Sequence, residues 1–190
     1  MRFDLAVAVL SLALLLATGA AAEAPPAEPD DYRQDDFRSP VPLTLQGARV
    51  VDTDQVWRLL ADAPRLVAVD VLPLPARPPR LAADNIWLPP PHWGLPGAVW
   101  LPDVGYGRLS EAGLRYFEDS LRQISDGDQQ RPLLFYCRAA CWMSWNAAKR
   151  ALQLGYRHVL WYPDGIDGWQ QAGRAVTELV PFAGGSPLAP

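Results

Sequence analysis

The fold of this chain is decided by the stretch Leu133-Leu134-Phe135-Tyr136-Cys137-Arg138-Ala139-Ala140-Cys141-Trp142. Its first four residues are apolar or aromatic and predict a buried strand, and residues 144–154 predict a helix that ends at Gly155. Both cysteines of the chain lie in the loop between these two elements. A thiol in this position faces the backbone N–H groups at the start of the helix, which favours the thiolate over the thiol.

Strands and helices alternate along the rest of the chain. Residues 66–72 form a continuous apolar run that predicts a strand buried on both faces. Further strands are predicted at residues 48–51, 98–101 and 158–162, the first at a sheet edge. Helices are predicted at residues 53–60 and 110–124, and residues 165–173 are predicted to form a turn that leads into a short helix. This order predicts an α/β fold with a mainly parallel central sheet and helices on both faces. Residues 73–102 include nine prolines, so most of this segment is expected to be neither helix nor central strand.

The N-terminal residues have the pattern of a secretory signal peptide. Arg2 precedes an apolar run at residues 5–16, and small residues follow the run up to Ala22. The run is too short to cross a bilayer, which takes about 20 apolar residues, and an uncleaved anchor is the alternative. We therefore expect an exported, periplasmic protein with no membrane span after cleavage of the signal peptide, residues 1–22.

Three further regions are predicted in the mature chain. A leader rich in proline and acidic residues, 23–47, is expected to be mobile or to lie along the domain. The domain itself is predicted at residues 48–180, and residues 181–190 are expected to form a flexible tail.

The composition excludes some classes of partner. The formal charge is −4 with no cluster of lysines or arginines, which gives no electrostatic reason to expect nucleic acid or an anionic membrane. The cysteine pair has no histidine near it in sequence, so neither a metal nor a cofactor is predicted. A disulfide that closes so short a loop removes little entropy from the unfolded chain, which favours a chemical over a structural role for the two cysteines.

Taken in chain order, four features resemble the rhodanese-like domain over residues 48–180. The strand at residues 66–72 contains Asp70 where that family closes an early strand with an aspartate, and Cys137 falls at the position of the family's catalytic cysteine. The other two features are the segment Leu95-Pro96-Gly97-Ala98-Val99 and the closing pattern of Gly155-Tyr156, Val159, Gly165, Gly168-Trp169 and Gly173. The resemblance implies that Cys137 carries a persulfide.

A narrower resemblance is to exported rhodanese-like proteins that are named for a Cys-Trp motif and associated with alcohol catabolism dependent on pyrroloquinoline quinone. It rests on three segments: residues 141–150, which begin with Cys141-Trp142, then Trp161-Tyr162-Pro163-Asp164-Gly165, and Leu88-Pro89-Pro90-Pro91-His92. It implies a periplasmic partner of quinoprotein alcohol metabolism, which is a pathway and not an activity.

The loop also departs from the rhodanese pattern. It is one residue longer, and Trp142 and Met143 stand where the family usually has an arginine that helps to hold an anionic substrate. The strand that contains Asp70 lacks the arginine that often follows this aspartate. Without an arginine fork, phosphatase activity is not expected and classical thiosulfate chemistry is less expected.

The candidate catalytic residues are Cys137, as the nucleophile, and Cys141, as the thiol that resolves an intermediate on Cys137. The alternative for Cys137 is a small buried residue at a strand end, and the alternative for Cys141 is a structural disulfide, which stays equally open. The candidate substrate-binding residues complete the loop and the first helical turn: Arg138, Ala139, Ala140, Trp142, Met143 and Ser144.

Several of these side chains have a plain structural interpretation as well. Arg138 is equally expected as an exposed loop arginine. Trp142 is equally expected in the core and in the wall of an apolar pocket, and Trp145 is expected in the core rather than in that wall. Asp70 and His92 are expected in supporting roles. Asp70 would set the electrostatics of the loop or, more simply, cap a turn, and His92 would activate a thiol or lie solvated in a loop, which the sequence favours.

Two functions follow from these residues. In the first, the protein acts through Cys137 in sulfur transfer by a persulfide, or in a thiol–disulfide step, with a small sulfur donor or a protein thiol as partner. In the second, it is a non-catalytic accessory protein that binds a periplasmic partner or a quinone-type cofactor through its segment rich in tryptophan and proline.

Overall fold

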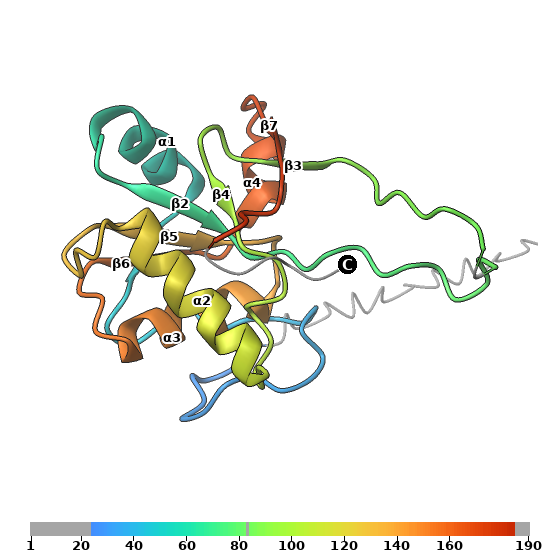
Figure 1. Cartoon of the computed structure of the whole chain (residues 1–190). Helices are drawn as coiled ribbons and strands as arrows, with labels where there is room; N and C mark the ends of the chain where they lie inside the picture. Colours follow the sequence, from blue (N-terminus) through green and yellow to red (C-terminus); the bar gives the residue numbers. More distant parts are fainter. Residues whose placement is uncertain (1–23, 83, 185–190) are drawn as a thin grey trace, which may run out of the picture.

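The computed structural model describes residues 24–82 and 84–184 and confirms the predicted α/β fold (Figure 1). Its central sheet has five parallel strands in the order β1-β6-β5-β2-β4, so the predicted edge position of β1 is confirmed. The strands are β1 (Arg49–Val50), β2 (Val67–Asp70), β4 (Val99–Trp100), β5 (Leu133–Tyr136) and β6 (Val159–Tyr162).

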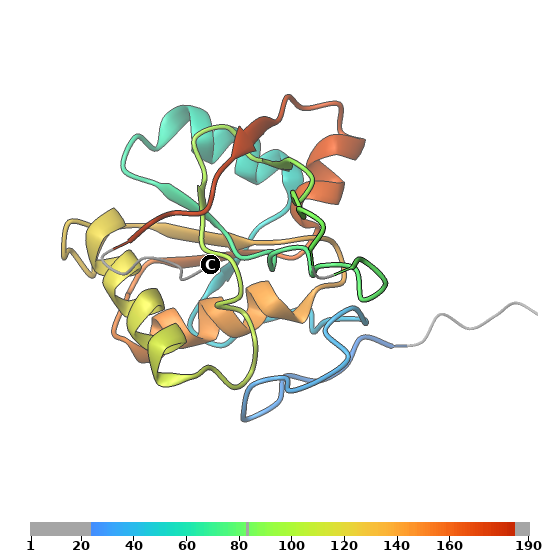
Figure 2. The same cartoon turned by 45° about the vertical axis from the view of Figure 1, so that its right-hand side comes forward.

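Helices cover both faces of this sheet (Figures 1 and 2). Helices α2 (Glu111–Ile124) and α3 (Trp142–Gln153) pack on one face, and α1 (Thr53–Asp62) and α4 (Gly165–Gln171) pack on the other. β5 and β6 are buried along their whole length because helices cover both of their faces. Helix α3 begins two residues before the predicted start at residue 144, since Cys141 takes the N-cap position.

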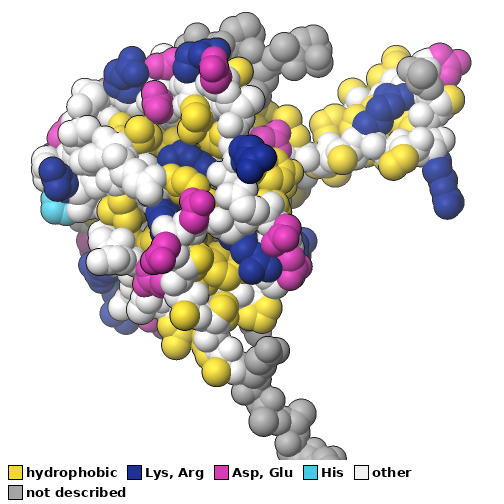
Figure 3. All heavy atoms as spheres, turned by 90° about the horizontal axis from the view of Figure 1, so that it is seen from below, with side chains coloured by type: hydrophobic (Ala, Val, Ile, Leu, Met, Phe, Trp, Pro, Cys, Tyr) yellow, Lys and Arg dark blue, Asp and Glu magenta, His cyan; other side chains and the backbone are white. Residues whose placement is uncertain are grey.

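A second, two-stranded sheet was not predicted. It pairs β3 (His92–Gly94) with β7 (Thr177–Leu179) in antiparallel register, with His92 opposite Leu179. The proline-rich residues before β3 form an arm, residues 73–82 and 84–91, that projects away from the rest of the described chain (Figure 1). Hydrophobic side chains lie along this projecting arm (Figure 3), and Ile86 and Leu88 are 87% and 78% exposed.

The leader packs on the domain. Asn146 of α3 is fully buried and binds the backbone of Arg33 twice, because its Nδ2 donates to the Arg33 carbonyl at 2.9 Å and its Oδ1 accepts from the Arg33 N–H at 3.0 Å. Lys149 Nζ donates to the carbonyls of Pro29 and Asp30 at 3.0 and 2.7 Å. Residues 24–47 are therefore an arm along α3, one of the two forms expected for the leader.

The folded domain continues past its predicted end at residue 180. Pro181 forms a bridge with Trp100, and the Phe182 N–H donates to the Trp100 carbonyl at 2.8 Å. The predicted start of the tail at residue 181 is therefore too early, because residues 181–184 extend the edge of the sheet beside β4. Residues 185–190 and the predicted signal peptide lie outside the described residues. Within the described ranges, no helix has the length and apolar character needed to cross a membrane.

Candidate functional site

The two cysteines lie at the junction of β5 and α3 and are joined by a disulfide. Cys137 directly follows the central strand β5, and Cys141 is the N-cap residue of α3. Their Cα atoms are 6.6 Å apart, within the range that a disulfide spans. Both residues are buried, with 0% and 2% of their surfaces exposed. In this oxidised form neither sulfur is a thiol, so any nucleophilic chemistry begins with reduction.

The backbone of the loop is held from the side of α4. The Ile166 N–H donates to the Cys137 carbonyl at 2.9 Å. Gly165 sits against the same carbonyl with a φ of +54°, and a Cβ added there would lie 2.5 Å from the Cys137 oxygen. Only glycine, which has no Cβ, can come this close to the Cys137 carbonyl. The glycine of the Asp164-Gly165 turn thus lets α4 approach the end of β5.

A carboxylate from α4 binds the middle of the loop. The Asp167 Oδ1 accepts two hydrogen bonds from the Arg138 guanidinium, one from Nε at 3.2 Å and one from Nη2 at 3.0 Å. The Asp167 Oδ2 accepts a longer one from the same Nε at 3.3 Å. Its Oδ2 also accepts the backbone N–H of Ala139 at 3.0 Å. Arg138 and Ala139 were predicted to lie at the site, but Asp167 was not. The spacing of Asp167 after the glycine turn that follows β6 is the only signal that could have indicated it.

The start of α3 is bound by the leader. The backbone N–H of Trp142 donates to the Phe37 carbonyl at 2.9 Å rather than to a sulfur atom. The Trp142 indole N–H donates to Ser39 Oγ at 3.1 Å. The helix start was expected to face a cysteine sulfur, but the leader accepts this N–H instead.

The residues of the first turn of α3 pack in the core. Trp142, Met143 and Ser144 are buried, and Ser144 Oγ donates to the Cys141 carbonyl at 3.2 Å and accepts the Trp161 indole N–H at 3.1 Å. Trp145 is also buried and stacks edge-on with Trp142 at 5.4 Å. These contacts favour the core interpretation of the two tryptophans over the wall of a pocket. Of the loop residues, Arg138 and Ala140 are exposed, and Ala140 adopts a positive φ of 47°.

Asp70 and His92 are brought together, but in the described chain no hydrogen bond joins either side chain to the cysteine loop. Asp70 Oδ1 accepts the Leu72 N–H at 2.9 Å, which confirms the predicted capping of a turn. Asp70 Oδ2 lies 2.9 Å from His92 Nε2, and the His92 ring stacks 4.1 Å from Trp100. The His92 side chain is only 10% exposed, so the favoured expectation of a solvated histidine was wrong. Pairing of β3 with β7 brings this ring onto Asp70, where it ties together the two ends of the projecting arm.

The comparisons with known proteins identify the family of the chain. The model of the rhodanese-like domain family matches residues 52–172, which include the cysteine loop, Asp70 and Asp167. The chain belongs to the rhodanese-like domain family. Among curated proteins, none matches the sequence.

Three solved structures are among those to which this chain is similar. A protein of unknown function from Rhodopseudomonas palustris is 22% identical, with a TM-score of 0.44, over 68% of this chain and 85% of that one. The polysulfide-sulfur transferase of Wolinella succinogenes is 17% identical, with a TM-score of 0.43, over 69% and 79% of the two chains. The 3-mercaptopyruvate sulfotransferase of Escherichia coli is 22% identical, with a TM-score of 0.44, over 75% and 57%.

Two buried tyrosines near the rhodanese-like loop are poor candidates for a base. Burial, together with the charge of Asp70, raises the pKa of Tyr136 well above its ordinary value. Burial raises the pKa of Tyr162 to about 12. Both phenols stay protonated at neutral pH, so neither can take a proton from a cysteine thiol.

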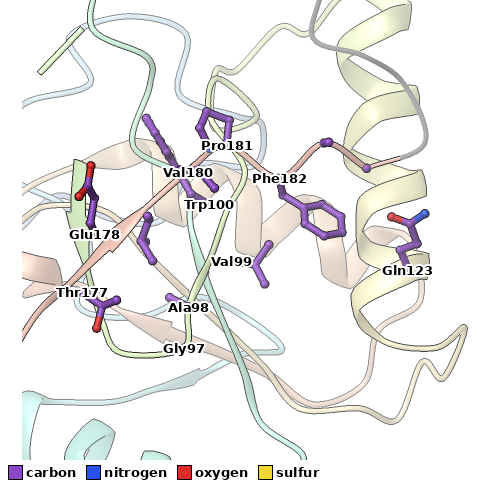
Figure 4. A pocket seen from close by; sticks show the side chains of 13 residues that line it. Gly97, Ala98, Val99, Trp100, Gln123, Thr177, Glu178, Val180, Pro181 and Phe182 are labelled. Atoms are coloured by element: carbon purple, nitrogen blue, oxygen red, sulfur yellow. The ribbon is translucent and has the colours of Figure 1, made fainter. Parts of the chain in front are cut away.

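The prominent pockets on the described residues lie away from the cysteine loop. The pocket in Figure 4 has a volume of about 780 Å³ and lies at the β4 edge of the sheet. Its wall combines β4, Gln123 of α2 and the C-terminal segment that contains Phe182. No group of three or more metal-ligating side chains gathers anywhere in residues 24–82 and 84–184.

Proposed function

We propose that this protein is an exported rhodanese-like protein in which Cys137 accepts sulfur and Cys141 resolves the intermediate as a disulfide. The observation that carries the proposal is the disulfide between Cys137, at the end of β5, and Cys141, at the N-cap of α3. It joins the residue at the family's nucleophile position to a second thiol four residues later. A short-loop disulfide adds little stability, which favours a redox role.

The proposed reaction starts from the reduced protein. The Cys137 thiolate attacks the terminal sulfur of an organic persulfide, the sulfur–sulfur bond of the donor breaks, and the donor leaves as a thiol. Cys137 then carries the persulfide. The Cys141 thiolate attacks the Sγ of Cys137, which forms the Cys137–Cys141 disulfide and expels the terminal sulfur as sulfide.

The electrons balance in this scheme. The sulfane sulfur gains two electrons and becomes sulfide, and the cysteine pair loses two electrons and becomes the disulfide. A dithiol reductant then exchanges with the disulfide to restore both thiols. If an acceptor thiol takes the sulfur from Cys137 before Cys141 reacts, the outcome is sulfur transfer without net oxidation.

The finer parts of the proposal come from sequence resemblance. We place the protein in the periplasm on the signal-peptide pattern, and we assign it an accessory role in alcohol oxidation dependent on pyrroloquinoline quinone. The segments Leu88-Pro89-Pro90-Pro91-His92 and Trp161-Tyr162-Pro163-Asp164-Gly165 support this role. A periplasmic location would also suit a protein whose working cycle includes a disulfide.

The experiment that tests the proposal measures sulfide release from an organic persulfide by the reduced protein. Cys137→Ser should abolish release, because it removes the residue that accepts the sulfur and leaves Cys141 without a second thiol in the loop with which to form a disulfide. Cys141→Ser should stop release after persulfide formation while leaving transfer to an added thiol intact. Release that persists in Cys137→Ser would refute the assignment of the nucleophile.

A second candidate function is a non-catalytic accessory protein, and the projecting arm favours it. The exposed Ile86 and Leu88 are large apolar side chains that a partner surface could cover. The sulfide-release assay separates the two functions, since a binding protein would give no turnover with any donor in either oxidation state.

A further inference from the structure

The loop between Cys137 and α3 has few groups that can hold an anion. Anions are bound in such loops by backbone N–H groups and by arginine forks. Arg138 is the only cationic side chain from Cys137 to Met143. The availability of Arg138 and of the N–H groups around it therefore decides whether the loop can accept an oxyanion such as thiosulfate.

Asp167 already binds these groups. Its carboxylate accepts from the Arg138 guanidinium at 3.0 and 3.2 Å and from the Ala139 N–H at 3.0 Å. One carboxylate of this chain thus takes the place that an oxyanion would occupy between the arginine and the backbone. It also cancels the only positive charge of the loop, so no net charge attracts a second anion.

One backbone donor at the start of α3 is bound as well. The Trp142 N–H donates to the Phe37 carbonyl of the leader, and the adjacent Trp142 and Met143 side chains are apolar and buried. Two independent contacts, one from α4 and one from the leader, thus satisfy donors that an oxyanion would need.

We infer that Asp167 determines the substrate class of the loop by excluding oxyanion donors, so that Cys137 takes sulfur from organic persulfides, whose reacting sulfur bears no oxyanion group. This inference rests on the proposed function of Cys137. Asp167 acts as a specificity-determining residue that does not touch the transferred sulfur.

The test compares Asp167→Asn with Asp164→Asn. Asparagine keeps the shape of the aspartate side chain and removes its charge. Asp164→Asn is the matched control, because it removes the same charge at the N-cap of the same helix from a side chain that makes no capping hydrogen bond. At low ionic strength, the half-saturating thiosulfate concentration for persulfide formation should fall about tenfold or more in Asp167→Asn. It should stay unchanged in Asp164→Asn, and the rate with an organic persulfide should change by less than about twofold in both.

A binding measurement separates this inference from the proposed function. Sulfate should protect the reduced thiols of Asp167→Asn from iodoacetamide at a concentration about tenfold lower than in the unmodified protein, whether or not any donor is turned over. Circular dichroism checks folding, and Asp167→Ser serves as a second variant if Asp167→Asn does not fold. The inference is overturned if the unmodified protein uses thiosulfate as well as an organic persulfide, or if neither Asp167 variant differs from Asp164→Asn in anion affinity.

Discussion

Gly165→Ala should destabilise the protein far more than an alanine at another glycine with a positive φ. An L-residue in the left-handed region costs about 1–2 kcal/mol, and Gly165 has a φ of +54°. The new Cβ would also lie 2.5 Å from the Cys137 oxygen and 2.8 Å from the Arg138 carbonyl carbon, so the backbone must move. Overpacking of this kind costs about 1–3 kcal/mol. The total loss in the free energy of unfolding is therefore about 2–5 kcal/mol.

Gly173→Ala is the matched control for this prediction. Gly173 has a φ of +68° with no atom within 4 Å of an added Cβ, so only the conformational cost of about 1–2 kcal/mol applies. Urea unfolding of the oxidised proteins measures both values. The contact with the Cys137 carbonyl predicts a difference of about 1–3 kcal/mol between the variants, and faster reduction of the disulfide in Gly165→Ala. Equal stabilities and equal reduction rates would refute the role of Gly165 in holding the loop.

Three further predictions concern the leader, the tyrosines and export. Asn146→Ala removes the hydrogen-bond partners of the partly buried Arg33 backbone N–H and carbonyl. It should lower the free energy of unfolding by roughly 1–3 kcal/mol and expose residues 24–47 to limited proteolysis. Proteolysis at the same rate as in the unmodified protein would contradict the packing of the leader on α3. The free energy of unfolding should fall as pH rises from about 10 to about 12. Burial raises the pKa of Tyr116 and Tyr162 to about 12, so the phenols of the unfolded chain lose their protons at lower pH than those of the folded protein. Urea titrations across this pH range measure the change. N-terminal sequencing of the protein from its native compartment should give Glu23 or a residue close to it, and a cytosolic protein that retains Met1 would contradict export.

The fold could be predicted because its signals are local. The apolar residues of β5 and the run that contains β2 indicate strands without reference to the rest of the chain, and their alternation with helices indicates a parallel sheet. β3 and β7 were missed because each has only three residues and forms through a pairing across more than 80 residues of sequence. The same reason explains why residues 181–184 were assigned to the tail.

The candidate site was predicted only where its residues are neighbours in sequence. Cys137 and Cys141 share one loop, so their pairing could be proposed as one of two alternatives. Asp167 reaches the loop from α4 and Phe37 reaches it from the leader, and neither contact leaves a pattern in the sequence near the cysteines. The burial of His92 was not predicted, because the short strand β3, which places His92 beside Asp70, directly follows a proline-rich segment and gives no strand signal of its own.

The most direct test of the account is the intact mass of the reduced Cys141→Ser protein after exposure to an organic persulfide. The expected result is a gain of one sulfur atom, located on Cys137 by peptide mapping and absent from a Cys137→Ser, Cys141→Ser double variant. The unmodified protein should instead lose two hydrogens, as its disulfide forms, and release sulfide. A Cys141→Ser protein that gains no sulfur, under conditions where its Cys137 thiol can be alkylated, would contradict the central claim that Cys137 accepts sulfur.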